Sequence, residues 1–257
     1  MSTIAKTASG SGAPRRVRGE PFFYYFAIMM TAVVFSGFII NAIVNHAEIE
    51  RFTAWIALHG LFSAVWYLLL INQLRLVRAG NLAAHRRMGK LSLLLFAGFL
   101  VSGVVMTVDL YQFVSSNPEF DLNDPSVRMG AGQAIGGIFL QWVLATVIFA
   151  LGLLNIRRPT HHKRFMIATS IQMAPAAVTR WLGLFALPGP LALPVLLLFY
   201  LVLVAYDWRS ERRIHWSTLV SLGIFMLLPL SFFFLFTQQW WGDLVVGVLG
   251  GWKPPGN

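Results

Sequence analysis

The stretch FFYYFAIMMTAVVFSGFIINAIV, residues 22–44, decides the fold class of this chain. It carries no charged side chain, and its length matches the roughly 20 apolar residues that a helix needs to cross a bilayer. A secretory signal has a shorter apolar region of about 7 to 15 residues and a small-residue cleavage site, and no clear site of that kind follows here. The stretch therefore predicts a membrane-spanning helix that is retained in the protein.

Six further apolar runs divide the rest of the chain, separated by turn sequences and basic loops. They cover residues 53–77, 91–113, 133–155, 165–187, 191–206 and 216–237. The pattern predicts an all-α fold, a polytopic membrane helix bundle with about seven transmembrane helices. We expect a flexible basic cytoplasmic tail at 1–20, the transmembrane domain at 21–237 and an interfacial C-terminal segment at 238–257.

The composition also excludes several classes of protein. Only 12% of the 257 residues are charged, against about a quarter in ordinary soluble domains, and 57% are hydrophobic. The net charge of +10 comes from loops between the apolar runs, so it indicates membrane topology and no nucleic-acid partner. The absence of Cys excludes disulfides, thiolate zinc sites and iron–sulfur clusters, whereas a cofactor held by His remains open.

The distribution of basic residues predicts the orientation of the chain in the membrane. Of the 20 Lys and Arg residues, 16 fall in the N-terminal tail and in the loops after the second, fourth and sixth predicted helices. By the positive-inside rule, the N-terminus lies in the cytoplasm and the C-terminus in the periplasm. The expected location is a bacterial inner (plasma) membrane, with the lipid bilayer as the main partner.

Two similar motifs begin helices on the basic side of the membrane. HRRMG, residues 85–89, begins the third predicted helix, and HKRFM, residues 162–166, begins the fifth. Two helical hairpins in parallel orientation would place His85 and His162 at the same depth. The alternative is that any cytoplasmic loop of a positive-inside protein collects such residues.

These two histidines are candidate cofactor ligands. A bis-histidine b-type haem needs two imidazoles at one depth on facing helices, and His85 with His162, or with His161, meets this requirement. Arg86 and Arg164 would then lie near enough to bind the haem propionates. The hypothesis is an electron-transfer or quinone-associated protein with one haem b, and with quinone or other membrane-protein subunits as partners. The alternative for both histidines is a solvated or helix-capping role.

A second group of polar side chains falls in the outer third of the predicted spans: His59, Asp109 and Arg180, with the Gln141 amide nearby. Charged residues inside spans are costly, roughly 2.5 to 3.5 kcal/mol at mid-span for Arg or Asp. One interpretation is an outward-facing pocket for an anionic or carbonyl-bearing ligand, in a non-enzymatic subunit or a small-ligand binding or transport protein. The other is an Arg180–Asp109 ion pair with a hydrogen-bonded His59, which only holds helices together.

The fifth predicted helix differs from the others. It is the least apolar run, so we expect it to be central and shielded from lipid. It also contains Pro175, which cannot donate a hydrogen bond to the Ile171 carbonyl. We therefore predict a kink in this helix.

Several of these motifs resemble known proteins. His59-Gly60, HRRMG at 85–89 and RRPTHHKRFMIAT at 157–169 are similar to motifs of a large group of uncharacterised bacterial multi-pass membrane proteins, over about residues 53–182. The same region faintly resembles the cytochrome b561 core, in which four histidines on four successive helices hold two haems. The fourth predicted helix here contains no His, so this resemblance implies at most one haem, on the inner side.

Common hydrolase and nucleotide-binding motifs are absent from the sequence. G-x-S-x-G, H-E-x-x-H and P-loop patterns do not occur. The sequence therefore assigns no catalytic residue, and it leaves open whether the protein is an enzyme.

Overall fold

The structure is a computed structural model of the chain that describes residues 20–44 and 53–251. These residues form helices joined by short turns and contain no strand. In chain order the helices are α1 (Glu20–Val44), α2 (Ala54–Arg78), α3 (Leu82–Ser115), α4 (Pro125–Leu154), α5 (Pro159–Gln172), α6 (Pro175–Leu184), the short 3-10 helix η2 (Gly189–Leu191), α7 (Ala192–Glu211), α8 (Trp216–Phe234) and α9 (Gln239–Gly250). Apart from residue 20, the predicted tail at 1–20 lies outside the described residues, as does 252–257 of the C-terminal segment.

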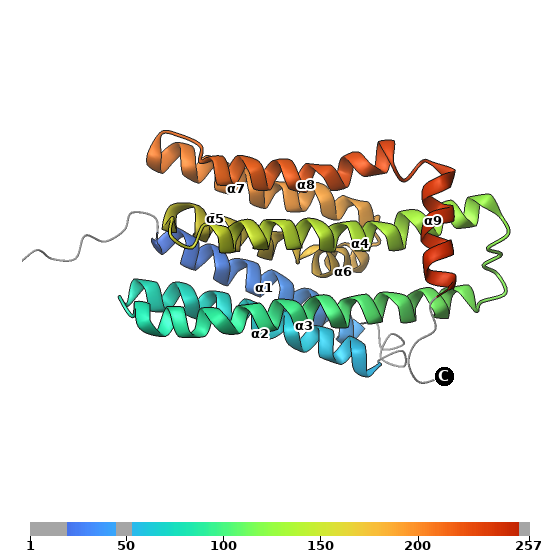
Figure 1. Ribbon diagram of the computed structural model, residues 1–257, viewed down its shortest axis with the longest axis horizontal. Coiled ribbons are helices and arrows are strands. Elements are labelled where there is room, and N and C mark those ends of the chain that lie inside the picture. Colours follow the sequence, from blue (N-terminus) through green and yellow to red (C-terminus); the bar gives the residue numbers. More distant parts are fainter. Residues whose placement is uncertain (1–19, 45–52, 252–257) are drawn as a thin grey trace, which may run out of the picture.

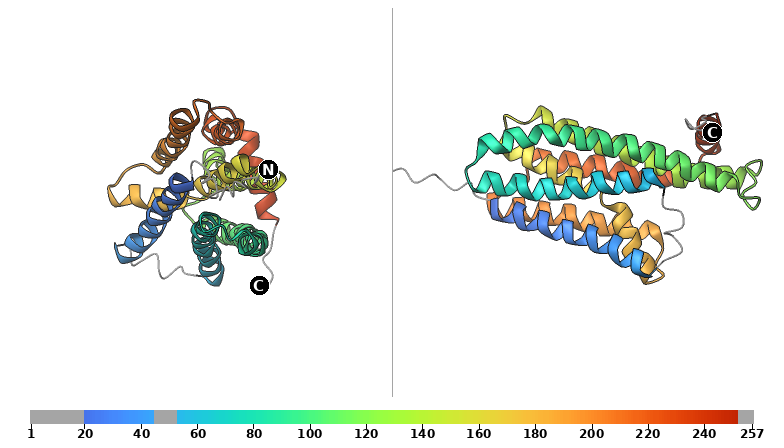
Figure 2. Two further views of the ribbon diagram at one scale, coloured as in Figure 1. Left: turned by 90° about the vertical axis from the view of Figure 1, so that its left-hand side faces the viewer. Right: turned by 90° about the horizontal axis from the view of Figure 1, so that it is seen from below.

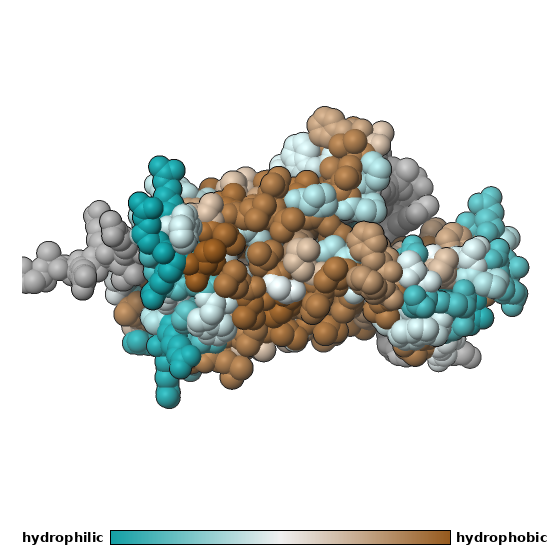
Figure 3. Space-filling model, turned by 90° about the horizontal axis from the view of Figure 1, so that it is seen from above, coloured by the Kyte–Doolittle hydropathy of each residue, from teal (hydrophilic) through white to brown (hydrophobic). Residues whose placement is uncertain are grey.

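Within the described residues, six helices are long and apolar enough to span a bilayer: α1, α2, α3, α4, α7 with η2, and α8. They run alongside one another in Figure 1. On the face drawn in Figure 3, an apolar band lies between two polar ends. The chain is therefore a multi-pass integral membrane protein, as the apolar runs predict. We call the end that holds the starts of α3, α5 and α8 the basic end, and the other the opposite end.

Polar residues in the loops define where several helices begin. The Thr53 hydroxyl accepts a hydrogen bond from the Ile56 N–H at the start of α2, and Asn81 does the same for Ala84 at the start of α3. Asp124 caps α4 and precedes a proline in its first turn. Such caps satisfy N–H groups that have no partner within the helix.

The predicted kink in the fifth helix is a complete break. Pro175 occupies the first turn of α6, and residues 173 and 174 separate α6 from α5. The Ala174 N–H donates instead to the Ile171 carbonyl at 3.1 Å, which closes α5 with a tight turn. Because α5 has 14 residues and α6 has 10, each helix alone is too short to cross a bilayer.

The prediction that this segment is central is confirmed for α5. It contacts α1, α4, α7 and α8, whereas α6 packs mainly on α1 (Figure 2). The polar side chains Thr169, Ser170 and Gln172 of α5 are buried. The Trp66 indole donates to the Ser170 hydroxyl at 3.0 Å, so α2 provides partners that lipid could not.

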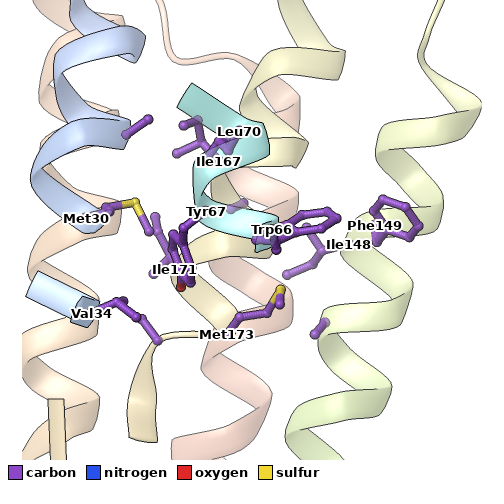
Figure 4. Packing of buried hydrophobic residues seen from close by; sticks show 14 of the residues in the cluster. Met30, Val34, Trp66, Tyr67, Leu70, Ile148, Phe149, Ile167, Ile171 and Met173 are labelled. Atoms are coloured by element: carbon purple, nitrogen blue, oxygen red, sulfur yellow. The ribbon is translucent and has the colours of Figure 1, made fainter. Parts of the chain in front are cut away.

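The core around α5 is large and aromatic. Figure 4 shows side chains from α1, α2, α4 and α5 meeting at mid-bundle, among them Met30, Trp66, Phe149 and Ile171. The ring of Phe149 also stacks on Phe96 of α3, with 4.2 Å between the ring centroids. Dispersion contacts of this kind replace the hydrophobic effect as the attraction between helices in a bilayer.

Glycines allow α9 to lie across the opposite end of the bundle, against α4 (Figure 1). A Cβ atom on Gly132 would lie 2.8 Å from the Gly242 Cα, and one on Gly136 would lie 2.7 Å from the Trp241 ring. The Trp241 indole donates to the Gly132 carbonyl at 2.8 Å. Small residues spaced four apart permit this close approach of two helices.

Candidate functional site

The structure brings His85 and His162 together at the basic end. Each is the fourth residue of its helix, α3 and α5 respectively. The centroids of the two imidazole rings lie 6.5 Å apart, and the ring planes are nearly perpendicular, at 83°. The prediction that the two histidines share one depth is confirmed.

The helix that precedes each histidine in the chain fixes its ring. Nδ1 of His162 donates to the Gly152 carbonyl of α4 at 2.8 Å, so Nε2 is the nitrogen that could bind a ligand. Nδ1 of His85 accepts from the Gln73 amide of α2, whose oxygen accepts from the Gly89 N–H at 3.0 Å. Within the described residues neither Nε2 atom has a hydrogen-bond partner.

The separation of the rings is compatible with two imidazoles that hold one metal ion, because metal–nitrogen bonds of about 2 Å on both sides of an ion place the ring centres roughly 6 Å apart. A ligating imidazole usually donates its other N–H to the protein, as Nδ1 of His162 does to the Gly152 carbonyl. Ligation through Nε2 of His85 requires its proton on Nδ1, with the Gln73 amide oxygen as acceptor in place of the amide nitrogen. In the part of the chain that the structure describes, no three His, Asp or Glu side chains form a metal site. The pair therefore suits a group that brings its own further ligands, as haem does.

The two arginines predicted to assist differ in availability. Arg86 is exposed next to His85 and makes no ion pair within the described residues. Arg164, by contrast, is only 1% exposed. Its Nε donates to Asp207 at 2.9 Å, its Nη1 to the Thr160 carbonyl at 2.8 Å and its Nη2 to both Asp207 and Glu211. Because these bonds use the guanidinium of Arg164, the geometry leaves only Arg86 for a propionate.

The Arg164–Asp207 pair is the centre of a buried network that the sequence analysis did not identify. The second oxygen of Asp207 accepts from the Thr218 hydroxyl at 2.6 Å and from the His215 N–H at 3.2 Å. Glu211 binds the His215 ring at 2.7 Å. The network thus joins α5, the end of α7 and the start of α8. A signal was present, because Asp207 and Glu211 lie four residues apart in a part of the sequence where nearly all other charges are basic.

His161 is next to His162 but serves this other network. Its Nδ1 lies 3.0 Å from the Ser217 hydroxyl, and its Nε2 accepts from the Trp216 indole at 2.9 Å. Both nitrogens of the His161 ring are therefore engaged, so the ring is not available as a metal ligand.

The residues predicted to form an outer pocket do not meet. Nδ1 of His59 lies 3.1 Å from the Phe99 carbonyl and 3.3 Å from the Ser102 hydroxyl, both on α3. Arg180 donates to the Ala176 carbonyl of its own helix at 2.9 Å, and its guanidinium lies over the Phe38 ring of α1. Asp109 makes no hydrogen bond or ion pair with any described residue, so the Arg180–Asp109 ion pair does not form.

Gln141 has a role at the break between α5 and α6. Its amide nitrogen donates to the Gln172 carbonyl at 2.9 Å. The side-chain nitrogen and oxygen of Gln172 are buried and have no partner within the described residues. Gln141 thus binds a carbonyl at the end of α5, and no hydrogen bond joins it to Arg180.

Comparisons with protein-family models, with curated proteins and with solved structures give no match for this chain. The geometry of the basic end is therefore the basis for assigning a function.

Proposed function

We propose that this protein holds one b-type haem between His85 and His162 and takes part in electron transfer in the membrane. The observation that carries this proposal is the 6.5 Å separation of two imidazole rings whose Nδ1 atoms are both hydrogen-bonded to the protein. The faint resemblance of residues 53–182 to the cytochrome b561 core agrees with a single haem at this end of the bundle.

Each residue of the site has a specific task in this proposal. His85 and His162 would hold the haem, which would supply reversible one-electron transfer. The Gly152 carbonyl orients the ring of His162, and the Gln73 amide orients the ring of His85. Arg86 binds a propionate at the polar end of the bundle. The electron partner is a membrane quinone or another membrane-protein subunit.

The proposal includes a topology of seven spans, in which α5 and α6 together form the fifth. Arg164 of α5 binds Asp207 near the end of α7, so these two helix ends lie together. Because α7 has 20 residues and a length of about 30 Å, its first residue lies at the opposite end of the bundle. The chain between α4 and α7 must cover that distance, and residues 159–184 do so.

We further propose that the basic end faces the cytoplasm of a bacterial inner membrane and that the C-terminus is periplasmic, because 16 of the 20 Lys and Arg residues fall in the N-terminal tail and in the loops after the second, fourth and sixth predicted helices. A reporter that is active only in the periplasm should be active when fused after Asn257 and inactive when fused at Asn81. Reversed activities would contradict this orientation.

The visible absorption spectrum of the purified protein tests the haem proposal. Protein produced with an adequate haem supply should show a Soret band, and His85→Ala and His162→Ala should each abolish it while the folded protein remains in the membrane. His161→Ala is the matched control, because His161 is adjacent in sequence but has both nitrogens engaged elsewhere. Colourless wild-type protein would overturn the proposal, and so would equal loss of the band in the control.

A further inference from the structure

A cleft of about 420 Å³ opens at the basic end, between the start of α5 and the turn that joins α7 to α8. Its lining includes Arg158, His161, Arg213, His215 and Trp216. These residues are separate from the His85–His162 pair, so the haem proposal does not account for the cleft.

The cleft carries an excess of positive charge. Arg158 is exposed and makes no ion pair with any described residue. The Arg213 side chain is 71% exposed, and the acid nearest to it, Glu211, lies 3.9 Å away. Glu211 already binds Arg164 at 3.2 Å and His215 at 2.7 Å. Both exposed guanidinium groups are therefore available for an anion.

The backbone around the cleft also favours an anion. Two helices, α5 and α8, begin at its wall, and neither Arg158 nor His215 caps its helix with a side-chain hydrogen bond. Among the described residues, the N–H groups of Thr160, Trp216 and Ser217 have no acceptor. Unpaired N–H groups and the positive ends of two helix dipoles add to the attraction of the two arginines.

The position of the cleft along the bundle indicates the source of such an anion. The cleft lies at the basic end, where α5 and α8 begin, and Trp216 on its wall is 40% exposed. Tryptophan prefers the level of the lipid headgroups, and basic pockets at that level bind anionic headgroups. Phosphate groups of soluble molecules can reach the same opening from water.

We propose that this cleft binds a phosphate group, either in the headgroup of an acidic phospholipid or in a soluble phosphate compound. Arg158 and Arg213 hold the phosphate oxygens from two sides, and the N–H groups at the start of α5 and α8 complete the contacts. The site needs no haem, so a negative haem test leaves this proposal unaffected.

Thermal unfolding in a neutral detergent tests the proposal. Wild-type protein is titrated with phosphatidylglycerol in mixed micelles, with phosphatidylcholine as the zwitterionic control, and separately with inorganic phosphate at constant ionic strength. The Arg158→Gln/Arg213→Gln variant should bind the effective anion at least tenfold more weakly. The matched control is Arg157→Gln/Arg209→Gln, which removes two exposed arginines of the same end that do not line the cleft.

Each outcome of this experiment has one meaning. Stabilisation by phosphatidylglycerol alone identifies a lipid headgroup, and stabilisation by inorganic phosphate identifies a soluble phosphate. Equal weakening in the two double variants, or no stabilisation of wild-type protein by either anion, overturns the proposal. If Arg158→Gln/Arg213→Gln does not fold, Arg213→Gln alone serves in its place, because that side chain is mostly exposed. An unchanged affinity in that variant would also overturn the proposal.

Discussion

Buried or half-buried ionisable side chains meet one another at the basic end of the bundle. In the opposite half the three that were predicted to meet lie apart, and the Arg128–Asp243 pair is partly exposed. At the basic end, His85 faces His162, and Arg164 is enclosed with Asp207 at 1% exposure of both side chains. In the opposite half, His59 and Arg180 bind backbone carbonyls or aromatic rings, and no ion pair joins Arg180 to Asp109. The difference shows that residues at one depth interact only when they also face the same point within the bundle.

The largest effect on stability should come from the buried pair at the basic end. Arg164→Leu or Asp207→Leu alone leaves one buried charge without its partner, which typically costs about 3 to 5 kcal/mol. The double variant should recover part of this loss. Free energies of unfolding in detergent micelles measure both effects. If the loss of unfolding free energy in the double variant equals the sum of the losses in the two single variants, the two charges do not interact.

The ring supports of the histidine pair should have the next largest effect. Gln73→Leu removes the amide that binds Nδ1 of His85, and loss of such a support typically weakens metal binding by about 10- to 100-fold. Titration of haem-free protein with haem measures the affinity. Gln141→Leu is a suitable control, because it also removes a side-chain amide but one that binds the Gln172 carbonyl at the break between α5 and α6 and no histidine. Equal weakening by both variants would indicate a general loss of packing.

At the opposite end we expect substitutions of Arg180 and Asp109 to change stability less, and their effects to add. Because no ion pair joins Arg180 to Asp109, the changes in unfolding free energy caused by Arg180→Leu and Asp109→Leu should sum within about 0.5 kcal/mol in the double variant. A double variant clearly more stable than this sum would show that the two residues interact, and it would restore the outer pocket as a candidate site.

The exposed pair between α4 and α9 should have the smallest effect. Arg128 and Asp243 lie 2.8 Å apart, but their side chains are 32% and 47% exposed. Solvent and salt screen such pairs, which contribute about 0 to 1 kcal/mol. Asp243→Asn should therefore lower the free energy of unfolding by less than 1 kcal/mol, and this loss should be smaller still in high salt. A loss comparable to that of Asp207→Leu would contradict the contrast between the two ends.

Periodicity and length predicted much of the fold. Apolar runs identified the membrane helices, because a bilayer requires a minimum length of helix and excludes charge. Pro175 predicted the disturbance of the fifth helix, although not its extent. A proline removes one hydrogen bond, whereas the complete break also depends on the turn that closes α5 at Ile171.

Which side chains pair with one another within the site was harder to predict. The shared depth of His85 and His162 followed from two similar motifs, and their contact agrees with it. Arg180 and Asp109 were predicted at a similar depth but do not meet. Arg180 lies on α6, which packs mainly on α1, whereas Asp109 lies on α3, which packs mainly on α2. The partner of Arg164 lies 43 residues away on α7, and such pairings depend on which helices become neighbours.

The break between α5 and α6 also affects how the chain enters the membrane. Insertion machinery selects segments by their apolarity, and residues 159–184 contain polar side chains such as Thr169 and Gln172 together with a proline at mid-segment. If this segment forms a span, as proposed, we expect it to insert together with its neighbours α4, made before it, and α7, made after it. Until the ribosome has made Asp207 of α7, Arg164 lacks the carboxylate that neutralises it.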